Sequence, residues 1–367
     1  MRHFLSTLVV CTFLFSCSKG SEVLPPSDVE RAGHQTCLSG ARTDLVSAGT
    51  WNMGIGFQVT DLLFLNLDSV RVIHERATKI FADARRALPR MRIRLMAEEI
   101  ARNRPDVLGL QETMYLAKDD TLIAHFLDTL EADLHALGVH DYQILSRPLN
   151  DATLHFASPT NGPDSMVMKF HEGQALLVSK RWTVVKDGIL PFRDVIPVNM
   201  LGLKTVTDRS AQWAWLRDST GFQLEVWNTH LEILDSKIIA QANEFLAISD
   251  SLRASMISKG HSPSGRLFLG DINSIPGVAA DPLLAKAGWV DNWSESKWGP
   301  GYTYGGGSIR DPARQMSQRL DRILSQGSCA IDTAFLRGDV ALATDSGALF
   351  PSDHALIVSR IRYGVRP

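Results

Sequence analysis

Short apolar runs bounded by polar residues recur along the chain from residue 45 onward. Val107–Gln111 and Arg266–Gly270 are continuous runs of the kind that a strand buried on both faces requires. Leu45–Trp51 is predicted to be a strand before them. Further strands are predicted at Ala175–Ser179, Trp182–Val185, Gln212–Arg217, Gln223–Asn228, Leu320–Ser325 and Leu356–Ile361.

Helical periodicity lies between these strands, at Arg90–Arg102, Thr121–Leu137 and Ile238–Leu252. In the first of these helices, the residues expected to face inward are Met91, Leu95 and Ile100. Those expected to face outward are Arg92, Arg94, Glu98 and Glu99.

The order of these elements predicts an α/β fold in one domain. The turn at residues 218–221 joins two of the predicted strands in a hairpin, and such hairpins argue against a purely parallel sheet. No internal repeat or break in composition divides the chain after residue 47. We therefore expect two packed mixed β-sheets flanked by helices.

The N-terminus has the pattern of an export signal. Arg2 and His3 precede the apolar run Phe4–Phe15, which is too short to span a bilayer as a mature helix. Residues 14–17 are similar to a bacterial lipobox, which predicts a signal peptide over residues 1–17 with Cys17 as the lipidation site. Ordinary signal cleavage with Cys17 incidental remains the alternative. Residues 18–46 then form a tether, and the protein is expected to be exported and anchored to a bacterial membrane, facing the periplasm or the exterior.

Charge and cysteine content limit the choices further. The chain has 38 Lys and Arg against 40 Asp and Glu, a net charge of -2, which lowers the case for a dedicated non-specific DNA binder without excluding a local basic groove. Cys37 and Cys329 remain after the signal and lipidation site, and an oxidising compartment permits a disulfide between them.

Polar residues suited to metal or phosphate end many of the predicted strands. Each segment alone is compatible with turn or cap chemistry, but a buried acid within an apolar run, such as Asp321, needs a partner. The segments, in chain order, are Trp51-Asn52, Gln111-Glu112, Asn228-Thr229-His230, Gly270-Asp271-Ile272-Asn273, Leu320-Asp321-Arg322-Ile323 and Ser352-Asp353-His354.

This ordered series resembles the endonuclease/exonuclease/phosphatase family over residues 47–362. The resemblance implies a deoxyribonuclease I-like, four-layer α/β sandwich and a hydrolase of phosphate esters. It implies Mg²⁺ as the cofactor, with Mn²⁺ as an alternative, bound mainly by Glu112 with Asn52 and Asp353.

The resemblance also implies catalytic roles. His354 would act as general base on the attacking water or orient it, and Asp321 would hydrogen-bond its far nitrogen. Asp271 would position or activate the water, while Asn273 and His230 would donate hydrogen bonds to the phosphoryl oxygens. Glu172 lies where some members carry an acid that orients the second histidine, although a plain turn acid is an alternative.

The substrate class stays open. An exported nuclease and a phospholipid-type phosphodiesterase are both compatible with the motifs, and the substrate is a nucleic acid, a nucleotide or a phospholipid. The only membrane contact expected is through lipid on Cys17; no protein partner is implied, and a monomer is expected. The alternative from another class is a surface lipoprotein that uses the fold as a non-catalytic binding module.

Two stretches depart from the compact family pattern. Residues 55–90 form an insert that begins with apolar Val59–Leu67 and continues into an Arg-rich helix through Arg85 and Arg86. This insert is either a lid that faces the substrate or an extra packed helix pair, and the sequence is compatible with both interpretations. Arg147–Lys169 is predicted to be irregular and lies where the family recognises substrate.

Overall fold

The computed structural model describes residue 37 and residues 43–57, 70–158, 164–200, 203–295, 299–344 and 347–364. The predicted signal peptide, Cys17 and most of the tether lie outside these residues, as does the apolar run Val59–Leu67. No helix in the described ranges is long and apolar enough to cross a membrane.

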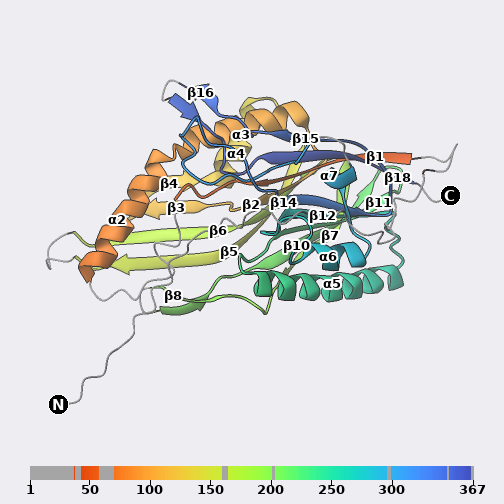
Figure 1. The fold of residues 1–367 in the computed structure, drawn as a ribbon, viewed down its shortest axis with the longest axis horizontal. Helices are drawn as coiled ribbons and strands as arrows, with labels where there is room; N and C mark the ends of the chain where they lie inside the picture. The colour runs from red at the N-terminus through yellow and green to blue at the C-terminus, as the bar shows by residue number, and fades with distance from the viewer. Residues whose placement is uncertain are drawn as a thin grey trace, which may run out of the picture. The chain divides into compact units, whose positions relative to one another are not determined.

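Two mixed β-sheets form the centre of the fold (Figure 1). The larger has eight strands in the order β15-β18-β1-β2-β6-β3-β4, with β5 also paired to β6. These are β1 (Thr43–Asn52), β2 (Val107–Gln111), β3 (Tyr115–Lys118), β4 (Thr121–His125), β5 (Tyr142–Phe156), β6 (Met166–Ser179), β15 (Ser328–Arg337) and β18 (Leu356–Gly364).

The smaller sheet has six strands in the order β13-β14-β12-β11-β10-β7. These are β7 (Trp182–Pro191), β10 (Ser210–Asp218), β11 (Gln223–His230), β12 (Gly265–Asp271), β13 (Val290–Asp291) and β14 (Asp321–Gln326). Two small hairpins complete the described strands: β8 (Pro197–Met200) with β9 (Leu203–Val206), and β16 (Leu342–Thr344) with β17 (Gly347–Leu349).

Helices cover the outer faces of both sheets. The larger sheet packs against α2 (Val70–Arg86), α3 (Pro89–Asn103) and α4 (Phe126–Ala136), and the smaller against α5 (Asp235–Ser258) and α6 (Asp281–Lys286) (Figure 1). A short α7 (Asn292–Glu295) lies beside β14.

Three hydrophobic layers hold these elements together. Between the sheets, Val46 and Leu176 meet Val226 and Leu267. Ile93 and other residues of α3 and α4 pack on the larger sheet, while α5 packs on the smaller. Because three apolar layers separate four layers of secondary structure, the predicted four-layer α/β sandwich is confirmed.

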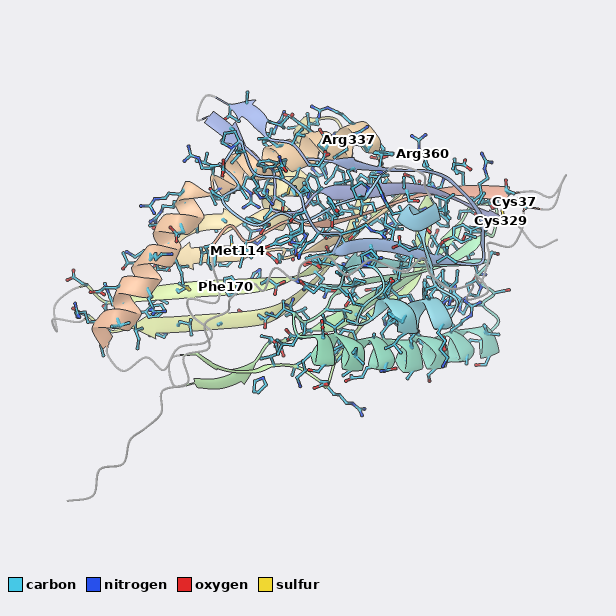
Figure 2. All side chains as sticks on the ribbon, in the orientation of Figure 1. Cys37, Met114, Phe170, Cys329, Arg337 and Arg360 are labelled. Carbon is cyan, nitrogen blue, oxygen red and sulfur yellow. A yellow bond between two sulfur atoms is a disulfide. The ribbon has the colours of Figure 1, made fainter. Side chains whose placement is uncertain are left out.

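The predicted disulfide is present. Cys37 and Cys329 are joined with 4.9 Å between their Cα atoms (Figure 2). The neighbouring Ser328 is paired through Tyr363 with Asp44, at the end of β1 opposite Asn52.

The orientation predicted for α3 is correct for Ile100, which is buried, but wrong for four other residues. Arg92 and Glu99, expected to face outward, are buried, whereas Met91 and Leu95 are only half-buried. The apolar stripe of the helix instead follows Ile93, Met96, Ala97 and Ile100, which have helical spacing and fill the core.

Two predictions of local structure also need correction. The predicted helix Thr121–Leu137 begins only at Phe126, because Thr121–His125 pairs with β3 as strand β4. His125 is the N-cap of the helix, and its Nδ1 accepts from the Asp128 amide. The stretch predicted to be irregular, Arg147–Lys169, lies largely in the long β5–β6 pair, whose many ladder bonds order residues 147–156 and 166–169.

The helical half of the insert is packed against the core. On α2, the residues Ala77, Ile80, Phe81 and Ala84 are buried in the layer beneath the larger sheet. This supports the packed reading for residues 70–86.

Candidate active site

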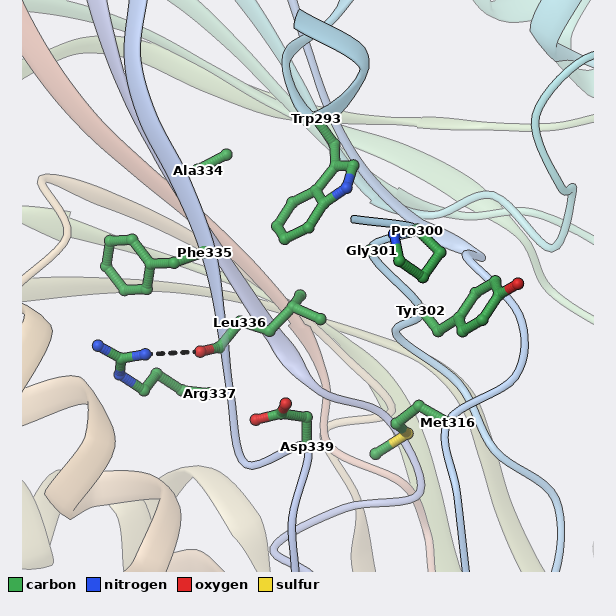
Figure 3. A pocket seen from close by; sticks show the side chains of 10 residues that line it. All are labelled: Trp293, Pro300, Gly301, Tyr302, Met316, Ala334, Phe335, Leu336, Arg337 and Asp339. Carbon is green, nitrogen blue, oxygen red and sulfur yellow. Dashed lines mark hydrogen bonds between the residues drawn. The ribbon is translucent and has the colours of Figure 1, made fainter. Parts of the chain in front are cut away.

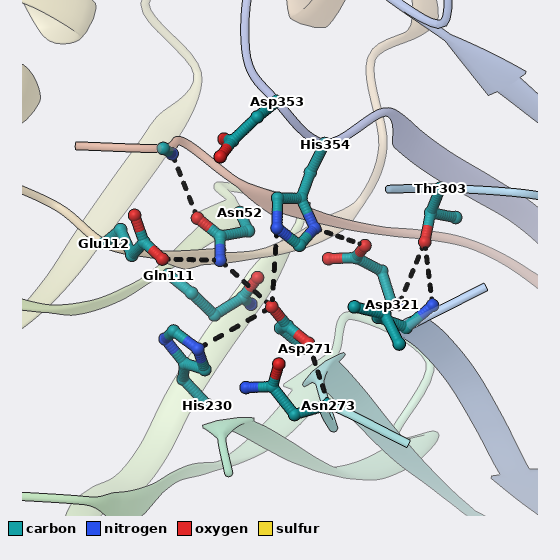
Figure 4. Close-up of polar contacts among 12 residues, drawn as sticks. Asn52, Gln111, Glu112, His230, Asp271, Asn273, Thr303, Asp321, Asp353 and His354 are labelled. Atoms are coloured by element: carbon teal, nitrogen blue, oxygen red, sulfur yellow. Dashed lines mark hydrogen bonds and ion pairs between the residues drawn. The ribbon is translucent and has the colours of Figure 1, made fainter. Parts of the chain in front are cut away.

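The strand registers bring most of the predicted site residues to one edge of the two sheets. Asn52 lies opposite Gln111, the residue before Glu112, across the parallel pair β1–β2. In the smaller sheet, Asp271 lies opposite both His230 and Asp321. Because these residues end neighbouring strands, their side chains converge on one buried cluster (Figure 4).

His354 and Asp321 form a buried pair. Nδ1 of His354 is 2.7 Å from Oδ2 of Asp321, so the predicted hydrogen bond is present. The hydroxyl of Thr303 accepts from the amides of Leu320 and Asp321 at 3.1 and 3.0 Å, which fixes the start of β14. The segment Gly301-Tyr302-Thr303-Tyr304 resembles the family's hydrolases, but its sequence does not indicate which strand end Thr303 supports.

Asp271 lies at the centre of the cluster. Its Oδ2 accepts from Asn52 Nδ2 at 3.1 Å and is 3.6 Å from His230 Nε2 and 3.7 Å from His354 Nε2. Its Oδ1 accepts from the Asn273 amide at 2.9 Å. Burial and the nearby charge of Asp321 raise the pKa of Asp271. The two imidazoles and two amides therefore surround one carboxylate.

Glu112 and Asp353 form the other half of the cluster. Glu112 Oε1 accepts from Asn52 Nδ2 at 2.9 Å, and its Oε2 accepts from the Ile55 amide at 2.8 Å. Burial, followed by the charges of Asp353 and Glu172, raises the pKa of Glu112 to about 7. The Glu112 backbone has φ of 55°, in the left-handed region that a residue other than glycine rarely adopts.

The two histidines have opposite protonation tendencies. Burial lowers the pKa of His354, but the carboxylates of Asp321 and Asp271 outweigh it and raise the pKa to about 10. Burial, followed by the charges of Arg209 and His354, lowers the pKa of His230 well below its usual value. At neutral pH these shifts favour an imidazolium at His354 and a neutral ring at His230.

Glu172 does not orient His230 as the resemblance implied. Its carboxylate accepts from Asn150 Nδ2 at 2.9 Å, and Nδ1 of His230 has no hydrogen-bond partner among the described residues. Burial raises the pKa of Glu172, and the neighbouring Arg209 opposes this rise. The strand ladder places Glu172 opposite Asn150 rather than in line with His230.

Arg209 lies beside the site, although the sequence did not single it out. It precedes β10, its side chain is 15% exposed, and its charge acts on both His230 and Glu172. An isolated arginine before a predicted strand gives no signal that it borders a site.

Asn228 stabilises the packing of the two sheets, although it lies in a motif predicted to form the site. It accepts from Gln111 Nε2 at 2.7 Å, and its Nδ2 donates to the carbonyls of Leu110 and Ala175 at 3.1 Å. Asn228 thus joins the two sheets directly beneath the cluster.

The profile of one protein family matches residues 49–354, from β1 to His354, and it is described as the Endonuclease/Exonuclease/phosphatase family. The chain belongs to this family. Members are phosphoesterases, and the resemblance seen in the motifs is thereby confirmed. No protein of curated function matches the chain in sequence.

Solved structures of family members share the fold. A Bacteroides thetaiotaomicron family protein has 13% identity and a TM-score of 0.58, covering 89% of this chain and 98% of that one. A mannosyl-6-phosphatase from the same organism has 15% identity and a TM-score of 0.55, with 86% and 99% covered. Truncated Caenorhabditis elegans TDP2 has 19% identity and a TM-score of 0.50, with 86% and 97% covered.

The residues around Glu112 suit the divalent cation that this family typically uses. Glu112 and Asp353 present carboxylate oxygens, which are the ligands that hard cations prefer. Asn52 turns its Nδ2 towards Glu112, and its Oδ1 accepts from the Gly54 amide with one of two lone pairs. Burial, followed by the negative charges of Asp353 and Glu172, disfavours the ionised carboxylate of Glu112 and raises its pKa. A cation at this point would relieve that repulsion.

A second grouping also brings possible ligand atoms together. Asp271, Asp321 and His354 each offer an atom within 4.8 Å of the others. Since Nδ1 of His354 is already hydrogen-bonded to Asp321, these three form a histidine–carboxylate relay more readily than a metal site.

A separate hollow of about 410 Å³ opens between β15 and the segment around residue 300 (Figure 3). Trp293, Leu336 and Met316 supply apolar walls, and Arg337 and Asp339 lie at its rim. None of the residues that line it belongs to the carboxylate and histidine cluster, so this hollow is distinct from the candidate active site.

Proposed function

We propose that the protein is an exported, divalent-metal-dependent phosphoesterase that cleaves its substrate by in-line attack of water. The convergence on Asp271 of His230, His354, Asn52 and Asn273 carries this proposal. A carboxylate that accepts from or faces four donors is suited to position a water molecule and receive its proton.

His354 and Asp321 supply directed positive charge. Because Asp321 holds Nδ1, the ring presents Nε2 towards Asp271 and the space beside it. The raised pKa of His354 favours an imidazolium that orients the water and stabilises phosphoryl oxygens, with Asp271 as the proton acceptor. Of the two roles implied for His354, we therefore favour orientation of the water.

His230 and Asn273 complete the donors to the phosphoryl group. His230 is neutral, so it contributes a directed hydrogen bond without adding charge. Asn273 Nδ2 already donates to the Leu231 carbonyl at 2.9 Å, which holds the amide in place. One remaining N–H of that amide is available to a substrate oxygen.

Glu112, Asn52 and Asp353 would hold Mg²⁺ or Mn²⁺. When bound, the cation neutralises charge on the phosphate and stabilises the leaving oxygen. Arg209, beside His230, would bind a further phosphate oxygen of the substrate.

The substrate is a phosphodiester or phosphomonoester met outside the cytoplasm: nucleic acid, nucleotide or phospholipid. The mannosyl-6-phosphatase among the structural neighbours is a reason to add a sugar phosphate to the compounds tested. The N-terminal signal and Cys17 support export and lipid anchoring, and Cys17→Ser would move an anchored protein from the membrane to the soluble fraction.

The test is hydrolysis of a substrate panel by the full chain. Plasmid DNA, RNA, sphingomyelin vesicles, nucleotides and mannose 6-phosphate would each be incubated with Mg²⁺, Mn²⁺ or EDTA. We expect metal-dependent cleavage of one class by wild type and none by His354→Ala. Turnover that is equal in EDTA, or equal in His354→Ala, would refute the mechanism. Metal binding without hydrolysis of any phosphate ester would instead favour the non-catalytic binding module.

A further inference from the structure

Arg92 on α3 is a fully buried arginine that lies behind the proposed metal ligands. Among the described residues, its guanidinium has no acidic partner at hydrogen-bonding distance. The hydrogen bonds that it makes there go to backbone carbonyls: from Nη2 to Met53 and, at 2.6 Å, to Gly54, and from Nε to Pro351 at 2.7 Å.

These carbonyls belong to the segments that carry two of the ligands, Asn52 and Asp353. The turn at residues 53–56 follows Asn52, and its amides face the site: Gly54 N donates to Asn52 Oδ1 at 2.9 Å, and Ile55 N donates to Glu112 Oε2 at 2.8 Å. Arg92 therefore holds one side of the turn while the other side holds Asn52 and Glu112.

The third carbonyl, that of Pro351, lies two residues before Asp353. Pro351 precedes Ser352, whose hydroxyl donates to the Asn52 carbonyl at 2.7 Å and accepts from the His354 amide at 3.1 Å. One guanidinium thus connects the backbone next to Asn52 with the backbone near Asp353, and the Ile55 amide of the same turn reaches the Glu112 side chain.

The turn is closely fitted around this arginine. A Cβ placed on Gly56 would lie 2.8 Å from Arg92 Nη1, and one on Gly54 would lie 2.2 Å from Asp353 Oδ1. Both glycines have positive φ, 62° at Gly54 and 80° at Gly56. Only glycine fits such positions without displacing its neighbours.

Arg314 supports the same segment from the other side. It donates from Nη1 to the Ser352 carbonyl at 3.2 Å and from Nη2 to the Asp353 carbonyl. Its guanidinium also stacks over Phe350 at 4.8 Å. Three consecutive carbonyls, from Pro351 to Asp353, are therefore held by two arginines.

Fold stability alone does not account for Arg92. A buried charge costs free energy that an apolar side chain of similar size would avoid. In the described part of the chain, Nη1 of Arg92 has no hydrogen-bond partner. A buried, incompletely satisfied cation beside a carboxylate cluster is instead suited to a functional task.

We propose that Arg92 is a positioning residue that sets the geometry of the Asn52, Glu112 and Asp353 ligands, with Arg314 holding the Asp353 side. The proposal rests on the proposed metal-dependent function. Residues that orient metal ligands typically change metal affinity or activity by about 10- to 100-fold when altered. Lysine keeps the charge but cannot hold the carbonyls on both segments at once.

The test compares Mn²⁺ binding by the full chain in wild type, Arg92→Lys and Arg266→Lys, using isothermal titration and thermal unfolding with and without the ion. Arg266 is the control, because it is also a buried arginine but pairs with Glu225 at the opposite end of β12 from Asp271. We expect Arg92→Lys to weaken Mn²⁺ binding by about 10-fold or more. Its metal-induced rise in Tm should shrink accordingly.

The outcomes separate the two claims. Arg266→Lys should lower Tm equally with and without Mn²⁺ and leave the affinity unchanged. Wild-type affinity in Arg92→Lys would overturn this inference alone, whereas a wild type that binds no divalent cation would overturn the proposed function and the inference with it. If Arg92→Lys does not fold, Arg314→Lys provides the decision: weaker Mn²⁺ binding supports the inference, and unchanged binding overturns it.

Discussion

The imidazole of His354 is held by the carboxylate of Asp321, with 2.7 Å between Nδ1 and Oδ2 and both side chains buried. The two residues come from different sheets, since Asp321 begins β14 and His354 precedes β18. Their contact therefore depends on how the sheets pack, and it fixes which ring nitrogen faces Asp271.

Asp321→Asn should lower kcat by about 100-fold or more, because the amide neither stabilises the imidazolium nor fixes the tautomer. Steady-state kinetics on the substrate found in the panel would measure this, with KM expected to change little. Asp332→Asn is the control, as Asp332 pairs with Arg362 on the strands β15 and β18 away from the cluster. Equal turnover in the two variants would contradict the role of Asp321.

The pattern of strand ends made much of this site predictable. Asn52, Glu112, His230, Asp271, Asp321 and His354 each lie at or next to an apolar strand end, and parallel or neighbouring strands bring such ends together. The hydrogen bond of Asp321 could be expected because a buried acid needs a partner.

Contacts that depend on tertiary packing could not be read in this way. Arg92 was predicted to be exposed because a charged residue on a helix usually is, and its contacts with the turn at 53–56 and with Pro351 explain its burial. Thr121–His125 continues a helical pattern, yet pairing with β3 decides its conformation. Glu172 faces Asn150 because of strand register, which its motif does not encode.

Glu112→Gln should change how the metal-free protein responds to pH. The pKa of Glu112 is about 7 in the folded protein against 4.5 for the ordinary group, so the folded state holds its proton more tightly. Stability from this group is then present at low pH and is lost as the pH rises from about 4.5 through about 7, by on the order of 3 kcal/mol.

Denaturant unfolding in EDTA at pH 5 and pH 8 would measure this effect. We expect Glu112→Gln to be more stable than wild type at pH 8 and to show a smaller difference between the two pH values. Adding Mg²⁺ should reverse the order by stabilising only the wild type. Identical pH dependence in both proteins would show that Glu112 is not strained by its neighbours.

Gly54→Ala should impair metal binding and activity. The new methyl group would lie 2.2 Å from Asp353 Oδ1 and 2.9 Å from Ser352 Oγ, so the ligand must move. Gly138→Ala is a matched control, with φ of 76° against 62° for Gly54 and no atom within 4 Å of an added Cβ. Both variants should lose about 1 kcal/mol from the left-handed backbone.

Only Gly54→Ala should raise the Mn²⁺ concentration needed for half-maximal turnover, measured by metal titration of the reaction. Equal metal dependence in the two alanine variants would mean that Asp353 does not contribute to binding.

Cys37→Ser and Cys329→Ser should each lower the free energy of unfolding by about 2–4 kcal/mol, since the crosslink restricts the unfolded chain. Chemical denaturation under oxidising conditions would measure this loss. The double variant should match either single variant, because each removes the same bond. A further loss in the double variant would indicate that one thiol stabilises the fold by other contacts.

The disulfide also determines where the N-terminal segment is attached to the domain. Cys329 lies next to the end of β1 marked by Asp44, and the catalytic cluster lies at the Asn52 end, about 27 Å away along the strand. Under the proposed lipid anchoring, the domain is attached at the end opposite the catalytic cluster. The cluster would then face soluble molecules rather than the membrane. To cleave lipids of the membrane in which it is anchored, the domain would have to reorient. An enzyme that cleaves soluble phosphate esters would not need to do so.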